Sequence, residues 1–340
     1  MSPAAADLDL FSACFAKNSS PRDRAVLEWQ YVANPSGKLL VDFALAPEPN
    51  RVAAIYATLP VRLRVGGEVT LGVQSVDTIT DVDFRGQGLF LELAESVYAR
   101  ATREGARLVY GFPNGSSAHG FFQRLQWQRL DPVPFLIRPL RTSYVLERLG
   151  FERYSRLVPD VRLHSIAQRG SRRVEEIRRF DDRATRLWDA FSTNIGVAVE
   201  RDARYLNWRL IDKPHEAYVS EGVCERDELV AFVSHVVKAK HGGRIGYVME
   251  ALCRPGRELV LRGLLDRALA NMTREGADVA LAWCMPHARP FRAFVSTGFV
   301  PFPVRFRPIE LHFGARAFSN NSRVAKRAEW YVSYLDSDTT

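Results

Sequence analysis

Apolar residues recur at helical spacing in two stretches of the chain, and strand-like segments precede and follow each stretch. In the first half the spacing predicts an amphipathic helix that ends at Gly105, with this apolar stripe: Phe90, Leu93, Ala94, Val97 and Ala101. Residues 43–80 alternate in hydrophobicity and are broken by Gly66-Gly67, which predicts a hairpin, and residues 108–112 predict another strand. Because two strands joined through a helix are parallel neighbours, we expect a mixed sheet.

The second half shows the same order of elements. Residues 228–237 and 246–252 predict strands, residues 258–274 a helix and residues 279–284 a further strand. The helix has its own apolar stripe: Val260, Leu264, Leu265, Ala268, Leu269 and Met272. We interpret both stripes as core packing.

Four landmarks repeat in the same order along the two halves. A tryptophan that precedes a proline by six positions occurs at Trp29 and Trp208, and the sequence TREGA occurs at residues 102–106 and 273–277. An apolar run then ends at Pro113 or Pro286, and an Arg-Pro pair follows at residues 138–139 or 307–308. Ordered matches of this kind indicate one duplicated unit.

The repeat predicts an α+β (mixed α/β) fold of two tandem domains, each a mixed, mainly antiparallel sheet flanked by helices. We place the N-terminal domain at residues 1–165 and the C-terminal, degenerate domain at residues 166–340. Between them, residues 141–150 predict a helix and residues 151–170 an extended connector.

Composition narrows the function classes. Four scattered cysteines without a CxxC pair, and histidines without a clustered motif, predict no disulfide framework and no metal site. The N-terminus, with Asp7 and Asp9, does not resemble a secretion signal, and no apolar run approaches the ~20 residues of a membrane span. We therefore expect a soluble, cytoplasmic protein that has no membrane partner.

The chain has 47 Lys and Arg against 39 Asp and Glu, a formal net charge of +8. Such an excess suits an anionic ligand such as CoA, a nucleotide-sugar or nucleic acid. Basic and aromatic residues do not interleave as in RNA-binding sheets, so nucleic acid is not the expected partner. The sequence does not indicate an oligomeric state.

The sharpest local signal is the segment from Thr80 to Phe90, TDVDFRGQGLF, between a predicted strand and a predicted helix. Gly86 and Gly88 allow a ligand to approach the backbone closely. The free amides at the following helix N-terminus favour an anion, so the segment predicts a pyrophosphate site.

This arrangement resembles the GNAT N-acyltransferase superfamily, whose acyl-CoA loop reads Q/R-x-x-G-x-G/A. Residues 83–88 match both glycines but have Asp83 where the family prefers Gln or Arg. The resemblance implies acetyl-CoA, or another acyl-CoA, as co-substrate. It implies that the loop backbone binds the pyrophosphate, through Arg85, Gly86, Gln87, Gly88 and Leu89. It also implies that Val76 and Thr78 of the preceding strand bind the pantetheine, and that Asn114 makes one further contact with CoA or the reacting groups.

Two catalytic groups can be proposed. We favour Asp77 as general base, although a structural pairing with arginine explains this carboxylate equally well. Phe122 stands where many relatives have a proton-donating tyrosine, so another donor is needed: Tyr110, His119, Ser116 or Ser117. We select His119, whose alternative interpretation is an exposed polar residue. The alternative for Asn114 is a turn residue.

The second half departs further from the family pattern. Gly256 is a single glycine where two are expected, and Glu258 would repel phosphate, so we expect this half to shape the acceptor site rather than to bind acyl-CoA. Asp336 and Asp338 in the tail could serve a cationic acceptor, but we expect a frayed acidic terminus.

The sequence therefore predicts transfer of an acetyl or short acyl group from CoA to the amine of a small molecule, such as an amino sugar or an amino acid derivative. One alternative is a catalytically weak acyl-CoA-binding regulatory or assembly protein. Another is transfer to a protein lysine or to an aminoacyl-linked acceptor.

Overall fold

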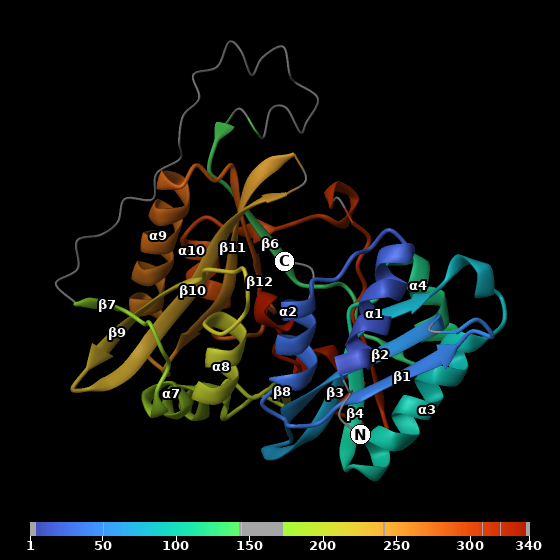
Figure 1. Cartoon of the computed structure of the whole chain (residues 1–340). Helices are drawn as coiled ribbons and strands as arrows, with labels where there is room; N and C mark the ends of the chain where they lie inside the picture. The colour runs from blue at the N-terminus through green and yellow to red at the C-terminus, as the bar shows by residue number, and fades with distance from the viewer. Residues whose placement is uncertain are drawn as a thin grey trace.

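The computed structural model of the protein contains two mixed sheets packed side by side (Figure 1). It describes residues 5–49, 51–142, 144, 173–240, 242–307, 309–319 and 321–337. The predicted helix 141–150 and connector 151–170 lie almost wholly outside the described residues, as does the predicted domain boundary at 165. The two-domain division therefore stays a prediction.

The first sheet has the strand order β1-β2-β3-β4-β14-β5, with β8 also pairing to β2. Among its described strands, only β3 and β4 pair in parallel. Its strands are β1 (Leu40–Leu45), β2 (Val52–Val65), β3 (Glu68–Thr80), β4 (Ala106–Gly111), β5 (Gln128–Arg129), β8 (Val197–Val199) and β14 (Gly314–Ala317).

The second sheet has the order β13-β6-β12-β11-β10-β9-β7, and within the part of the chain that the structure describes β11 and β12 form its one parallel pair. Its strands are β6 (Phe135–Pro139), β7 (Val174–Glu176), β9 (Val219–Glu225), β10 (Glu228–Lys240), β11 (Gly243–Cys253), β12 (Val279–Trp283) and β13 (Val300–Pro301). The predicted mixed, mainly antiparallel sheets are thus confirmed.

Helices cover both sheets. The first half has α1 (Ala5–Lys17), α2 (Arg24–Leu27), η1 (Glu28–Val32), η2 (Val82–Phe84), α3 (Leu89–Arg103), α4 (Gly115–His119) and η3 (Gly120–Arg124). The second has α7 (Asp182–Ser192), α8 (Ala203–Leu210), α9 (Glu258–Arg274), α10 (Phe291–Ser296), η4 (Val304–Phe306), η5 (Arg327–Glu329) and η6 (Tyr334–Asp336). The predicted apolar stripes pack α3 on the first sheet and α9 on the second.

Each half of the chain contributes strands to the other half's sheet, which the sequence did not predict; β8 of the second half, for example, pairs with β2. β6 precedes the connection between the halves, yet it pairs with β12 of the second sheet. β14 follows the second sheet in the chain, yet it pairs with β4 of the first. Each half therefore completes the other's sheet, and one large apolar cluster draws residues from both, including Leu63, Tyr110, Phe232 and Tyr247.

The repeated tryptophans meet where the two halves touch. The rings of Trp29 and Trp208 stack with centroids 4.7 Å apart and planes 18° apart. Each indole Nε1 donates a hydrogen bond to the other residue's carbonyl, at 2.7 and 2.9 Å. Reciprocal contacts between equivalent residues indicate an approximate two-fold relation between the halves.

The fourth repeat landmark is wrong as a structural equivalence. Arg138-Pro139 lies in β6, whereas Arg307 follows the short helix η4, and β14 begins only at Gly314. The exchanged strands β6 and β14 are equivalent by their places in the sheets, each next to a short outer strand. The Arg-Pro match therefore does not mark equivalent strands.

Candidate functional site

The two parallel strands of the first sheet separate near their carboxyl ends. β3 and β4 pair from Leu71–Ala106 as far as Ser75–Gly111. Beyond that point β3 continues to Thr80 and contains a register shift against β2, which places an extra residue at Val76 or Asp77. Because such a bulge bends its strand and ends pairing, residues 76–80 have no pairing with β4. Val76 and Thr78, the predicted pantetheine contacts, lie in this segment.

The glycine turn follows directly. Gly86 and Gly88 adopt φ values of +79° and +82°, and Gly88 is the residue before α3. A Cβ added at either glycine would meet no atom within 4 Å, so backbone conformation, and not crowding within the chain, requires glycine here. The turn is solvent-exposed.

The N-terminus of α3 opens onto this turn. Its first helical hydrogen bonds run from the amides of Leu91 and Glu92 to the Gly88 carbonyl, at 2.9 and 3.2 Å. The preceding amides, from Arg85 to Leu89, precede the helical ladder and belong to the end that carries partial positive charge. The predicted loop residues Arg85, Gly86, Gln87, Gly88 and Leu89 are therefore together at one helix end.

Acidic residues beside this end are neutralised. Lys17 of α1 donates to Asp81 at 2.8 Å and to Asp83 at 3.1 Å, and Arg51 pairs with both carboxylates. The Lys17 ammonium, and then the Arg51 guanidinium, lower the pKa of the Asp83 carboxyl. The two cations keep these carboxylates from repelling an anion bound at the turn.

Asp77 is almost buried and fully engaged. Its Oδ1 accepts from Nε and NH2 of Arg22 at 3.1 and 2.7 Å. Its Oδ2 accepts from Gln30 Nε2 at 2.9 Å and from the Tyr31 hydroxyl at 2.8 Å. The arginine pairing named above as the alternative is thus present, and it ties β3 to the segment around α2. A role of Asp77 as general base stays a prediction.

Asn114 and His119 lie at the two ends of the short helix α4. Asn114 caps the helix, since its side-chain oxygen accepts from the Ser117 amide at 3.0 Å and from the Ser116 and Ser117 hydroxyls at 2.7 and 3.1 Å. His119 is exposed at the other end. Both serines that could have served as proton donors are therefore engaged by the cap.

Tyr110, the remaining candidate donor, is buried on β4. Its hydroxyl donates to Gln74 Oε1 at 3.2 Å. Burial, and then the nearby Asp336 carboxylate, raise its pKa well above the usual value. A hydroxyl held in this way is a hydrogen-bonding group between two strands and is a poor proton donor at neutral pH.

A histidine that the sequence did not indicate lies beside Phe122. The His312 ring meets the Phe122 ring edge-on at 5.9 Å. Its Nδ1 lies 2.8 Å from Asp131 Oδ2, and its Nε2 lies 2.9 Å from Glu310 Oε1. Asp131 and His312 are 181 positions apart in the sequence and become neighbours only through the pairing of β14. No local sequence pattern could therefore predict this cluster.

The end of the described chain, residues 330–337, forms a C-terminal strap between the halves (Figure 1). The prediction of a frayed acidic terminus is wrong for this segment, because Asp336 is 2% exposed. Arg201, completely buried, donates from Nε to Glu250 at 2.9 Å and from NH2 to Asp336 at 2.6 Å. The Ser333 hydroxyl also donates to Glu250, at 2.9 Å. Asp338 lies outside the described residues.

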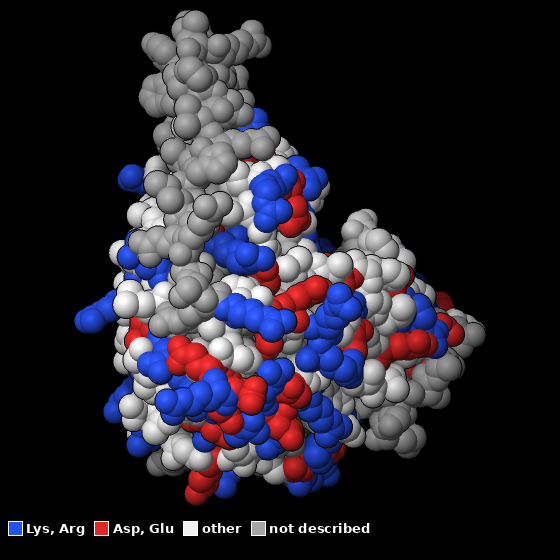
Figure 2. Space-filling view, turned by 90° about the vertical axis from the view of Figure 1, so that its left-hand side faces the viewer, with Lys and Arg blue, Asp and Glu red and all other residues white. Residues whose placement is uncertain are grey.

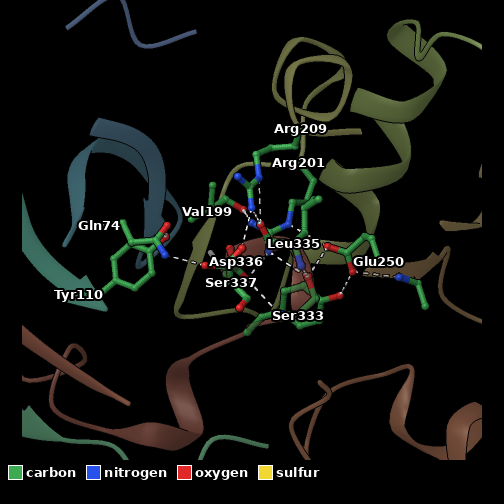
Figure 3. A network of polar contacts seen from close by, with 12 residues as sticks. Gln74, Tyr110, Val199, Arg201, Arg209, Glu250, Ser333, Leu335, Asp336 and Ser337 are labelled. Carbon is green, nitrogen blue, oxygen red and sulfur yellow. Dashed lines mark hydrogen bonds and ion pairs between the residues drawn. The ribbon is translucent and has the colours of Figure 1, made fainter. Parts of the chain in front are cut away.

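The strap also reaches the first sheet (Figure 3). Gln74 Nε2 donates to the Asp336 carbonyl at 2.6 Å, one residue before β3 and β4 separate. Arg209 donates to the carbonyls of Leu335 and Ser337, at 2.7 and 2.9 Å. The chain end is therefore fixed at the inner end of the site by partners from both halves. Sequence reasoning missed this because Gln74 and Asp336 are 262 positions apart.

Residues 5–130 match the family model of the acetyltransferase (GNAT) domain. The first part of the chain is therefore similar to a GNAT acetyltransferase domain. The matched part contains the bulge, the glycine turn and Asn114, and it stops before β6, which pairs in the other sheet. No curated protein sequence matches the chain.

Solved structures share the fold over nearly the whole chain. Saccharomyces cerevisiae N-myristoyltransferase with bound myristoyl-CoA and inhibitors is 13% identical, with a TM-score of 0.59 over 91% of this chain and 76% of that one. A GCN5-related N-acetyltransferase from Anabaena variabilis is 11% identical, with a TM-score of 0.59 over 91% and 69%. At these identities the likeness concerns the fold.

Two further observations concern the described residues. None of their helices is long and apolar enough to cross a membrane. None of their His, Cys, Asp and Glu side chains form a group of three that could hold a metal ion.

Proposed function

We propose that this protein transfers an acetyl or short acyl group from CoA to the amine of a small molecule, such as an amino sugar or an amino acid derivative. The observation that carries the proposal is the exposed double-glycine turn at the N-terminus of α3, directly after the bulge that separates β3 from β4. The turn amides would hold the pyrophosphate, and the free edge at Val76 and Thr78 would hold the pantetheine.

The reaction then requires little from side chains. The amine nitrogen attacks the thioester carbonyl, whose growing negative charge a β3 amide would stabilise. The carbon–sulfur bond breaks, the amine loses a proton and the thiolate gains one. We retain Asp77 as the proposed base and His119 as the proposed acid. Asp77 must release one of its partners before it accepts a proton, because each of its oxygens already accepts two hydrogen bonds.

Calorimetric titration with acetyl-CoA tests the assignment of the first half. Gly88→Glu places a side chain and a negative charge on the turn, so we expect binding to fall below detection while the fold is retained. Gly256→Glu is the matched control: Gly256 also has a positive φ, +77°, and precedes α9, so it carries the same backbone strain in the other half. Loss of binding in Gly256→Glu with full binding in Gly88→Glu would overturn the assignment.

The acyl chain length and the acceptor are to be found by turnover. The structural neighbour from yeast was solved with myristoyl-CoA, so the panel should include long-chain thioesters beside acetyl-CoA. If turnover is fastest with acyl chains of two to four carbons, the proposal is supported. A preference for a long chain would correct it.

The alternative function, acyl-CoA binding without turnover, has one observation in its favour. Asp77 is held by Arg22, Gln30 and Tyr31, and Phe122 offers no proton. Saturable binding of acetyl-CoA together with no product from a broad amine panel would favour this alternative. Product formation that is unchanged in both Asp77→Asn and His119→Gln would keep the enzyme but remove the two proposed residues.

A further inference from the structure

A cavity of about 680 Å³ opens in the second half of the protein. It lies between the first turn of α9, the loop that joins β12 to α10, and the start of the C-terminal strap at Trp330 and Tyr331. This volume is in the range of small-molecule sites, about 300–1,000 Å³.

The cavity occupies the same place in the second sheet as the glycine turn and the separated strands do in the first. β11 and β12 pair only as far as Val248–Ala282, and the register shift against β10 puts the extra residue at Met249. α9 follows β11 as α3 follows β3, and Pro286 follows β12 as Pro113 follows β4. The cavity is therefore the second copy of the candidate acyl-CoA site.

This copy is closed to a pyrophosphate. Glu258 stands in the first turn of α9, and its carboxylate accepts from the Gly256 amide at 3.3 Å and from Arg289 NH1 at 3.2 Å. A carboxylate of the chain itself thus takes the place that an anionic ligand would have at this helix end. A CoA diphosphate at the same place would meet this charge, so an anionic ligand could enter the cavity only away from the N-terminus of α9.

The remaining polar groups of the cavity are mostly donors. Arg292 lines it, is exposed and makes no ion pair within the described chain. Arg289 is already paired with Glu258, and its Nε, which has no acceptor among the described residues, is buried. Since His287 Nε2 lies 3.0 Å from the Trp330 carbonyl, its hydrogen bond is already used. Glu329 also lines the cavity, but it is paired with Arg323.

The walls between these groups are apolar. Phe191, Ile195 and Trp330 contribute to the lining. Arg292 beside this apolar wall suits a flat or branched body that carries one carboxylate, because a guanidinium fork binds both carboxylate oxygens. We propose that this cavity binds a small organic carboxylate with an apolar body, at a site separate from acyl transfer.

The proposal goes beyond the function proposed above and does not depend on it. The ligand would touch Trp330 and Tyr331, at one end of the strap whose other end is fixed to Gln74 in the first sheet. Occupancy of the cavity is therefore expected to stabilise the strap, and a thermal shift reports it directly.

The experiment compares matched pairs of probes by thermal shift and calorimetry on the full chain. Benzoate, phenylacetate and N-acetylphenylalanine are the carboxylates; benzamide, phenylacetamide and N-acetylphenylalanine amide are their neutral partners. We expect at least one carboxylate to raise the melting temperature and to bind at least tenfold more tightly than its amide.

Variants locate the site. Arg292→Gln changes an exposed side chain, so it should fold normally and weaken carboxylate binding about tenfold. Arg274→Gln, at the opposite end of α9, is the matched control and should bind as the unmodified protein does. Gly88→Glu should also bind the carboxylate unchanged, which separates this site from the acyl-CoA site.

Three outcomes would overturn the proposal. The first is that no carboxylate shifts the melting temperature. The second is that each amide binds as well as its acid. The third is that Arg292→Gln binds as tightly as Arg274→Gln does.

Discussion

At the scale of single residues, the buried side chain of His235 makes the stability of the protein depend on pH. It lies on β10, is 1% exposed, and neither ring nitrogen has a hydrogen-bond partner among the described residues. Burial lowers its pKa from about 6.5 to about 4. The folded protein therefore keeps this ring neutral at pH values at which the unfolded chain protonates it.

The sign of the pH effect follows from this difference. Above pH 6.5 neither state binds the proton, and the contribution to stability is complete. As the pH falls from 6.5 towards 4 only the unfolded chain takes up the proton, so the free energy of unfolding decreases, by roughly 3 kcal/mol in total. Urea unfolding of His235→Leu should lack this decrease, whereas His119→Leu, at an exposed position, should retain it. An equal pH dependence in both variants would contradict the argument.

Residues also show where sequence reasoning succeeds. Gly86 and Gly88 were predictable because a positive φ leaves a local signature in residue type. The arginine pairing of Asp77 could be named as an alternative, but not its partner. Arg201 and Asp336 could not be connected, because 135 positions separate them and only the folded chain makes them neighbours.

At the scale of elements, the helices were predictable and the exchange of strands was not. The apolar residues of α3 and α9 recur in the sequence with a period near 3.6, which predicts a helix with one buried face. A strand's pattern shows only that it needs neighbours and on which face it is buried. The sequence of residues 135–139 and 314–317 does not indicate which sheet these strands join. The placement of β6 and β14 could therefore be learned only from the structure.

The exchange predicts a long-range effect of a change in β14. Ala315 is fully buried and pairs with Tyr110 of β4 and with Gln128 of β5. Ala315→Pro removes a ladder hydrogen bond from a strand that is paired on both sides, and a buried carbonyl left without its donor costs about 1–3 kcal/mol. We expect a lower melting temperature and weaker acetyl-CoA binding, although residue 315 lies far along the chain from the glycine turn. Ser319→Pro, at an exposed position just beyond β14, is the control, and an equal effect there would contradict the explanation.

At the scale of the whole molecule, buried charge joins the two halves. Arg201 on one side contacts Glu250 and Asp336, and the strap that carries Asp336 contacts Gln74 on the other side. Charges on the surface behave differently. Over the face shown in Figure 2, basic and acidic side chains are interspersed. Ion pairs such as Arg186–Glu228 and Arg257–Glu225 are partly exposed to solvent.

This contrast gives a prediction for stability. Arg201→Met leaves two buried carboxylates without their cation, so we expect a loss of about 3–5 kcal/mol in urea unfolding. Arg178→Met is the control, since Arg178 is 85% exposed and its ion pair with Glu176 is at the surface, where such pairs contribute about 0–1 kcal/mol. Comparable losses in both variants would show that the buried network does not join the halves energetically.

The exchanged strand also constrains how the protein is made. β4 leaves the ribosome about 200 residues before β14, the strand that covers its outer edge. At about 5–20 residues per second, that edge stays uncovered for roughly 10–40 s during synthesis. An open, apolar strand edge is a place where nascent chains associate wrongly. Biosynthesis of this protein should therefore depend on chaperones that hold the first half until translation is nearly finished.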